Sequence, residues 1–280
     1  MSFSNERTSD FPFGPAKPVY LNFIEKSFQK QIAYKFEYFV GVLNGLLFIF
    51  VFTSLWSAIY AGADTVEGSP FTRSQMISYA VFAMLFRISM TMEDNEIGRK
   101  IRTGAISMDF IKPVSYPLML FSEAVGQTLF HWFTRVIPLS IISLLAFDAS
   151  MPKDLSAYAL TAVAWVLGYS ILYIINFGFS LLAFWFTEVF SFQLMKFGLF
   201  TLFSGGIVPI DFFPDFAKPF IALIPFQYIL YVPTSIFIGH IQGAEAIRLL
   251  LIQLAWVLAL GFICWRVWKA AQKKLIVQGG

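Results

Sequence analysis

The sequence is poor in the residues that build disulfides, metal clusters and catalytic sites. It has one cysteine, Cys264, and two histidines, His131 and His240, in 280 residues. A single cysteine has no partner for a disulfide, and two distant histidines do not suggest a metal site. The sequence also lacks a GxxxxGKS/T phosphate loop, an HExxH zinc motif and a GxSxG nucleophile motif. Nothing here supports an enzyme, and ATP hydrolysis through a phosphate loop in this chain is excluded.

Charged residues are also scarce. Asp, Glu, Lys and Arg make up 13% of the chain, whereas 58% of the residues are hydrophobic and 19% are aromatic. This composition excludes disordered, collagen-like and coiled-coil proteins and is typical of a polytopic membrane protein. The net charge of +3 is too small to indicate binding of nucleic acid. We therefore expect an all-α membrane protein that contacts lipid and binds no nucleic acid.

Long apolar runs predict six membrane-spanning helices, because about 20 residues cross roughly 30 Å of hydrocarbon. Four runs are secure, and they cover approximately residues 39–60, 75–92, 118–147 and 155–186. A fifth begins near Phe192 and soon meets Gly205, and the sixth covers approximately residues 246–268. The polar N-terminal segment has no short apolar core before a cleavage site, so no cleavable signal peptide is expected.

Prolines interrupt the apolar stretch between the fifth and sixth spans, at about residues 207–240. They are Pro209, Pro214, Pro219, Pro225 and Pro233. Prolines at this spacing break a continuous helix. We therefore expect two short helical pieces that enter and leave on one side, forming a re-entrant hairpin buried against protein rather than lipid.

The distribution of basic residues predicts the orientation of the chain. With the N-terminus in the cytoplasm, only Arg73, Lys153, Lys218 and Arg248 lie on the outer side, and the other basic residues outside the spans lie inside. Both termini are then cytoplasmic, and the hairpin is extracellular. The chain divides into a cytoplasmic segment (1–37), a transmembrane domain (38–268) and a cytoplasmic tail (269–280).

The N-terminal segment carries the pattern of a surface helix. Apolar side chains recur at every fourth position from Tyr20 to Phe36, and Glu25, Lys26 and Lys30 lie on the opposite side. This pattern predicts an amphipathic helix on the inner membrane surface. It serves either as a simple membrane anchor or in a more specific role.

The loop between the second and third spans is the internal loop densest in charge. It places Glu93 and Glu96 before Arg99 and Arg102, an order that suits the dipole of a short helix, and Gly104 then ends that helix. Two interpretations are open: an ordinary solvated connection, or a docking helix for a cytoplasmic partner.

The third span carries a polar stripe. Glu123, Gln127, His131 and Arg135 follow one another at intervals of four and so share one face of a helix. Ionisable groups at membrane depth are costly and usually face the bundle interior or a cavity. The stripe is therefore either a set of structural pairing groups or part of a pathway or gate. Arg87, in the second span, is expected to be an interfacial charge or a pairing partner.

These features, in this order, resemble the permease subunits of ABC transporters of the ABC-2 (type V exporter) class. The resemblance covers nearly the whole chain and includes the amphipathic helix, the loop EIGRKIRTGAISMDFIKP and the segment SGGIVPIDFFPDFAKPFIALIPFQYILYVP. The C-terminal KKLIVQGG is similar to the tail of one subfamily of drug-type and uncharacterised export permeases. The hairpin pattern of the class is matched by Gly205, Gly206, Pro209, Phe213, Pro214, Pro225 and Phe226.

The resemblance implies a half-transporter in a bacterial inner membrane. A second permease, either identical or related, would pair with this chain, and two cytoplasmic ABC ATPase subunits would bind ATP and Mg, leaving this chain with no cofactor, metal or catalytic residue of its own. The hairpin would form the outer gate, and the Phe-rich spans favour export of an apolar or amphipathic cargo. The coupling helix would contain Glu93, Glu96, Gly98, Arg99, Arg102 and Gly104.

Two other functions remain open. One is an ATP-independent secondary transporter or channel, in which the polar stripe from Glu123 to Arg135 relays ions or protons. The other is a membrane scaffold or sensor that recruits cytoplasmic proteins without transport.

Overall fold

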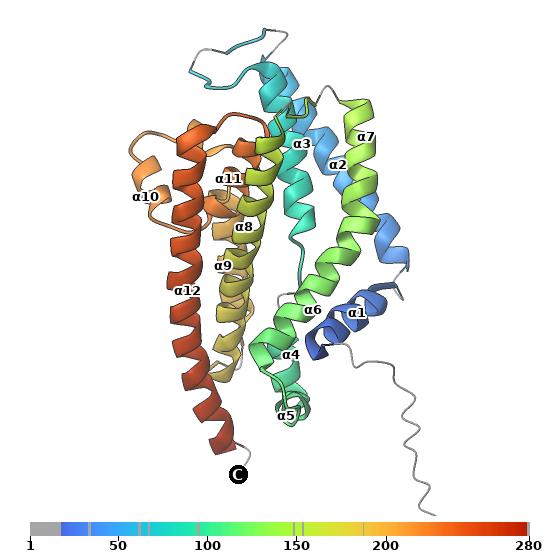
Figure 1. Ribbon diagram of the computed structural model, residues 1–280, viewed down its shortest axis with the longest axis vertical. Coiled ribbons are helices and arrows are strands. Elements are labelled where there is room, and N and C mark those ends of the chain that lie inside the picture. The colour runs from blue at the N-terminus through green and yellow to red at the C-terminus, as the bar shows by residue number, and fades with distance from the viewer. Residues whose placement is uncertain are drawn as a thin grey trace, which may run out of the picture.

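The computed structural model describes residues 18–32, 35–60, 63–66, 68–93, 96–147, 149–152, 154–186 and 188–278. Within these ranges the chain forms helices and connecting turns and no strand, so the prediction of an all-α protein is confirmed (Figure 1). The elements are, in order, α1 (Val19–Ile32), α2 (Lys35–Tyr60), α3 (Arg73–Ser89), α4 (Glu96–Arg102), α5 (Ile106–Phe110), α6 (Tyr116–His131), the π-helical turn η1 (Trp132–Val136), α7 (Ile137–Ala146), α8 (Leu155–Leu181), the 3-10 turn η2 (Leu182–Phe184), α9 (Phe190–Phe203), the 3-10 turn η3 (Ile210–Phe212), α10 (Lys218–Ala222), α11 (Gln227–Phe237) and α12 (Gly243–Gln278).

Four helical segments in the described part of the chain are long and apolar enough to cross a membrane. They are Tyr38–Tyr60, Tyr116–Ala146, Leu155–Phe184 and Gly243–Lys274, and they make the chain a multi-pass membrane protein. Helices α3 and α9 have 17 and 14 residues. At 1.5 Å per residue they reach only about 26 Å and about 21 Å, less than the roughly 30 Å of hydrocarbon. The count of six crossings therefore stays a prediction.

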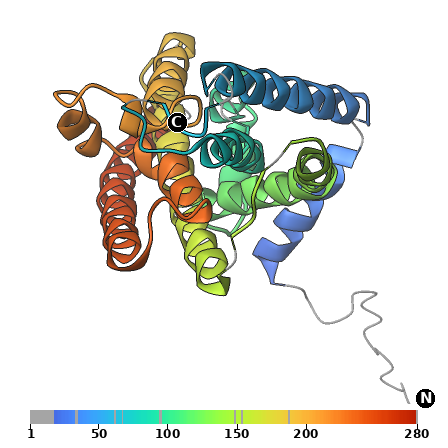
Figure 2. The same cartoon turned by 90° about the horizontal axis from the view of Figure 1, so that it is seen from above.

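Helix α3 lies near the middle of the molecule, with α2 and α6 beside it (Figure 2). It begins with a capping box, in which Gln75 N donates to Thr72 Oγ1 at 3.3 Å and Thr72 N donates to Gln75 Oε1 at 3.0 Å. Most of its side chains from Met76 to Leu85 are buried. Because protein encloses α3, this helix needs less apolar surface than the helices that face lipid.

The third predicted span is bent and locally unwound. The π-helical turn η1 separates α6 from α7, and Pro138 lies in the first turn of α7. A proline has no N–H and crowds the preceding turn, and a π-helical turn relieves this by inserting an extra residue. The insertion rotates the following residues relative to those in α6. The turn interrupts the regular α-helical geometry between His131 and Arg135, so the common face from Glu123 to Arg135 stays a prediction.

Helix α1 packs directly against α6. A side chain at Gly126 would collide with the backbone carbonyl of Ile24, so glycine permits the close approach. Ser27 Oγ donates to the Glu123 carbonyl at 2.7 Å, and the rings of Phe28 and Phe130 lie 5.6 Å apart. The amphipathic helix is shorter than predicted, because α1 ends at Ile32 and α2 has begun by Lys35.

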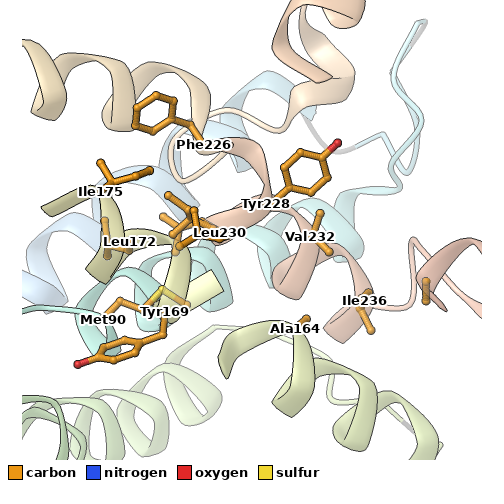
Figure 3. Packing of buried hydrophobic residues seen from close by; sticks show 13 residues of the cluster. Met90, Ala164, Tyr169, Leu172, Ile175, Phe226, Tyr228, Leu230, Val232 and Ile236 are labelled. Carbon is orange, nitrogen blue, oxygen red and sulfur yellow. The ribbon is translucent and has the colours of Figure 1, made fainter. Parts of the chain in front are cut away.

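The predicted hairpin region contains η3, α10 and α11, at the end of the molecule opposite to α4 and α5 (Figure 1). Pro233 lies inside α11, so the prediction that it breaks the helix is wrong. Pro233 cannot donate to the carbonyl of Ile229, and this carbonyl lies against Gly168 of α8. Side chains of α11 and α8 form one buried cluster, in which Leu230 lies near Leu172 (Figure 3).

Helix α12 is continuous from Gly243 to Gln278. It packs along α8, and both helices run from the hairpin end toward the end that carries α4 (Figure 1). The predicted boundary at residue 268, between the last span and the tail, therefore falls inside a helix.

Candidate functional site

The loop after α3 folds into two short helices, α4 and α5, at one end of the molecule (Figure 1). Ile97 and Gly98 of α4 are buried, and Ile97 packs with Ile106, Leu181 and Trp268. The apolar side of α4 is thus fixed against the ends of α8 and α12. The charged side chains of α4 lie on its other sides.

Ion pairs join α4 to α5. Lys100 Nζ lies 2.9 Å from Glu96 Oε1 and 2.8 Å from Asp109 Oδ2, and Lys112 Nζ lies 2.7 Å from Asp109 Oδ1. Burial alone would raise the pKa of Asp109, but hydrogen bonds from the two lysines outweigh burial and hold this pKa below its ordinary value. Burial also opposes the charge of Lys100, yet its bonds to Asp109 and Glu96 raise the Lys100 pKa. The pairs hold the two helices in a fixed relation.

The remaining predicted coupling residues are spread around α4. Arg99 is 55% exposed and pairs with Glu93 at 3.0 Å between Nη2 and Oε1. Arg102 is exposed on another side and lines a surface hollow of about 370 Å³ together with Lys274. Gly104 has a φ of 71°, a conformation that suits glycine, and it separates α4 from α5.

The polar stripe divides between different surroundings. Gln127 Oε1 accepts a hydrogen bond from the backbone N–H of Glu93 at 2.9 Å, which ties the start of the charged loop to α6. His131 is buried, and its ring lies 5.9 Å from that of Phe130. Arg135, in η1, points toward α2, where its guanidinium occupies the space that a side chain at Gly41 would need. Gln127 and Arg135 line different cavities.

The first part of the predicted gate is a tight glycine turn after α9. Gly205 has a φ of 77°, and a side chain there would collide with Tyr231. The Gly205 carbonyl accepts from Tyr79 Oη at 2.7 Å, and Tyr231 N donates to the Ser204 carbonyl at 2.9 Å. Gly206 is buried against Leu230. This turn joins α9, α3 and α11.

The rest of the predicted gate residues extend from the surface to the core. Phe213 packs against Phe203 with ring centroids 6.4 Å apart. The carbonyls of Pro209, Pro214 and Pro225 each accept a backbone N–H three residues later, so the prolines shape three successive turns. Pro214 is exposed, whereas Phe226 is buried in the cluster that joins α11 to α8.

The sequence did not predict the contacts or the burial of several charged residues. Asp109 joins α4 to α5, and its only sequence signal is Lys112 three residues later. Arg87 is expected to be an interfacial charge or a pairing partner, and no carboxylate forms an ion pair with it in the described part of the chain. Its guanidinium instead lies 5.6 Å from the ring centroid of Phe200. Lys196 is 4% exposed within α9.

These elements define a multi-pass helical membrane protein with charged surface helices at one end and a packed helical hairpin at the other. The model of the family described as "ABC-2 family transporter protein" matches residues 46–279. The chain belongs to this family and is a permease component of an ABC transporter. Permeases of this family are membrane components without an ATPase of their own, and they associate with ABC ATPases and form dimers. No curated protein matches the sequence significantly.

The resemblance inferred from the sequence is confirmed at the level of the family. The narrower subfamily suggested by the C-terminal residues stays a prediction.

Proposed function

We propose that this chain is the transmembrane subunit of an ATP-driven exporter for an apolar or amphipathic substrate. It works in a bacterial inner membrane with both termini in the cytoplasm. Two cytoplasmic ABC ATPase subunits bind ATP and Mg, and a second permease, identical or related, completes the pathway. The single observation that best supports this proposal is α4, which is anchored on its apolar side and exposes Arg99 on the other.

Two connections from α4 are suited to transmit motion. Ile97 packs in the cluster that contains Leu181 of α8 and Trp268 of α12, so a displacement of α4 acts on both helices. The bond from the Glu93 backbone to Gln127 links the start of the same loop to α6. In our proposal, closure of the ATPase pair shifts α4 and thereby selects between two arrangements of the spans.

The proposed gate is the hairpin at the opposite end. Its glycine turn is fixed by Tyr79 and Tyr231, and α11 packs in the main buried cluster. A closely packed element of this kind has few intermediate positions, which suits a gate that is either closed or open.

The proposal is tested by purifying the tagged chain from its native membrane in mild detergent and identifying the bound proteins by mass spectrometry. We expect an ABC ATPase in a one-to-one ratio with permease chains, with ATP-dependent transport by the complex in proteoliposomes. Recovery of a stable permease oligomer without an ATPase would contradict the proposal.

A matched pair of variants tests the role of α4. Arg99→Gln removes an exposed charge from α4, whereas Arg248→Gln removes an exposed charge from α12 at the hairpin end. We expect Arg99→Gln to reduce ATPase retention or to separate ATP hydrolysis from transport, and Arg248→Gln to leave both unchanged. Equal behaviour of the two variants would show that α4 is not the coupling helix. The same measurements on Glu96→Gln and Gly98→Leu test the first residue of α4 and its buried side.

A second candidate function is ATP-independent transport. The observation that favours it is the pair of neighbouring ionisable residues His131 and Arg135 within a membrane-spanning segment. Proteoliposomes that contain only this chain test the alternative. Flux driven by a proton gradient, with no ATPase present, would favour a secondary transporter or channel over the exporter.

A further inference from the structure

A cavity of about 410 Å³ lies between α2, α3, η1 and α9. Arg87 of α3 and Arg135 of η1 both line it. A neighbouring hollow of about 180 Å³ shares Arg87 and Phe197 with this cavity and adds Lys196. Basic side chains from three different elements therefore converge on one region of the membrane domain.

The charged side chains in the lining of the two hollows are basic. No acidic side chain of the described residues lines either hollow. Arg87 is only partly exposed, and its guanidinium has the ring of Phe200 beside it rather than a carboxylate. A cation at membrane depth is costly, and the cost falls when an anion forms hydrogen bonds with it. Arg87 is thus prepared to bind an anionic group that enters the cavity.

The other walls of the cavity are apolar and aromatic. They include Phe48 and Phe52 of α2 and Phe197 of α9, with Asn44 and Thr201 as neutral polar groups. A bare inorganic anion would leave these aromatic walls without a partner. A molecule with an anionic head and an apolar chain would satisfy both parts of the cavity.

Arg135 lies in the π-helical turn and lines this cavity. Within η1, Arg135 points toward Gly41 and the cavity wall. Such turns recur at functional sites in helices. The local backbone and the charge of the lining therefore indicate the same place.

We propose that this cavity binds an amphiphile with an anionic head, with the head at Arg87 and Arg135 and the apolar chain along the aromatic walls. If the amphiphile is the exported cargo, the proposal specifies the class of substrate, and this part of it rests on the proposed exporter function. The same chemistry is shared by an exported acidic amphiphile and by an acidic membrane lipid.

Binding is measured with the purified full-length chain in neutral detergent by native mass spectrometry. The probes are dodecyl phosphate, dodecyltrimethylammonium and inorganic phosphate. We expect dodecyl phosphate to bind at least about tenfold more tightly than either of the others, because both charge and chain contribute. Equal binding of inorganic phosphate or of the cationic amphiphile would overturn the proposal.

Variants locate the binding at the cavity. Arg87→Gln is expected to weaken dodecyl phosphate binding about tenfold or more, since a charge-assisted hydrogen bond is lost. The control Arg266→Gln removes the same charge from α12, which does not line the cavity, and should leave binding unchanged. Equal binding by wild type and Arg87→Gln would overturn the assignment.

A second variant keeps the test valid if Arg87→Gln does not fold. Thr201→Phe retains every charge and fills part of the cavity from α9, where Thr201 is only partly buried. We expect this variant to elute as a single species and to bind dodecyl phosphate more weakly than wild type. Unchanged affinity in a folded Thr201→Phe protein would overturn the proposal.

ATP hydrolysis distinguishes the two sources of the ligand. Stimulation of the complete complex by dodecyl phosphate, abolished in Arg87→Gln, would identify the site as one for exported cargo. Binding without any change in hydrolysis would identify it as a site for an acidic lipid, such as phosphatidylglycerol. Both results uphold the site. The binding assay needs no ATPase, so it can succeed even if the exporter proposal fails.

Discussion

At the end that carries α4 and α5, a network of ion pairs helps to join the elements, whereas at the hairpin end side-chain hydrogen bonds to backbone carbonyls help to join them. Lys100 bridges α4 and α5 through Asp109. At the other end, Tyr79 bonds to the Gly205 carbonyl, and Gln253 of α12 donates to carbonyls of both α8 and α11. The Lys100–Asp109 pair is itself largely buried, with side chains 18% and 9% exposed, so solvent screens it little.

This difference separates two tasks within one chain. At the α4 end, Arg99 is exposed, so a soluble partner can engage its charge and leave again. A packed hairpin excludes solvent and resists small displacements. Variants at the two ends should therefore fail in different ways, and the following predictions are ordered from the largest expected effect on stability to the smallest.

The strongest test of the packed end is Gly168→Ala. A methyl group at Gly168 would lie 2.8 Å from the Ile229 carbonyl and 3.2 Å from that of Tyr228, so α8 and α11 must separate. We expect a loss of about 2 to 3 kcal/mol in the free energy of unfolding. The control Gly198→Ala meets no atom within 4 Å and should be neutral or stabilising by up to about 1 kcal/mol. Denaturant unfolding followed by tryptophan fluorescence measures both. Similar values would mean that the α8–α11 contact is not close.

Gln253→Leu tests the hydrogen bonds at the same end. The fully buried side chain of Gln253 donates to the Ala164 carbonyl at 3.0 Å and to the Tyr228 carbonyl at 2.7 Å. Losing both bonds should lower the free energy of unfolding by about 1.5 kcal/mol. Gln29→Leu, on the exposed side of α1, is the matched control and should stay within about 0.5 kcal/mol of wild type. A neutral Gln253→Leu would show that packing alone holds α12 to the hairpin.

The sequence predicts the long helices better than their interruptions. Continuous apolar runs are enough to place α2, α8 and α12, because hydropathy depends on composition over many residues. The π-helical turn escapes such an analysis, and its one sequence signal is Pro138. Pro233 shows the opposite outcome, since α11 continues through it. The effect of a proline depends on what its neighbours can pack against, which sequence alone does not specify.

Among the candidate site residues, too, some features are visible in the sequence and others depend on how the helices pack. The charges of α4 are visible in the sequence, because acids precede bases within one short segment. The Lys100–Asp109 pair depends on the turn at Gly104, and the convergence of Arg87 and Lys196 depends on how α3 and α9 pack. These contacts arise from tertiary structure, so a periodicity in the sequence cannot reveal them.

Asp109→Asn tests the ion-paired end and should have a smaller effect, of about 1 kcal/mol. Because the folded-state pKa of Asp109 is below its ordinary value of about 4, its stabilisation is present above that pH and is lost as pH falls through the folded-state pKa. The raised Lys100 pKa keeps the pair charged up to at least about pH 10. Unfolding free energies of wild type and variant should therefore differ at neutral pH and converge in acid.

An unchanged difference between neutral and acidic pH would mean that Asp109 acts through packing and not through charge. Asp215→Asn is the control at the hairpin end. Asp215 also pairs with a lysine, Lys218, at 2.8 Å, but its side chain is 97% exposed. Solvent screens this pair, so its removal should change stability less than the removal of Asp109 does.

The smallest effect on stability is expected for the exposed pair Glu93 and Arg99. A double-mutant cycle with Glu93→Gln and Arg99→Gln should give a coupling energy below about 0.5 kcal/mol, because both side chains reach solvent. A value of about 2 kcal/mol or more would make the pair part of the structural framework and would remove the contrast between the ends. If the Arg99→Gln variant of the cycle also keeps the free energy of unfolding of wild type, a loss of ATPase retention in this variant cannot come from unfolding. The charge itself would then be what the partner recognises.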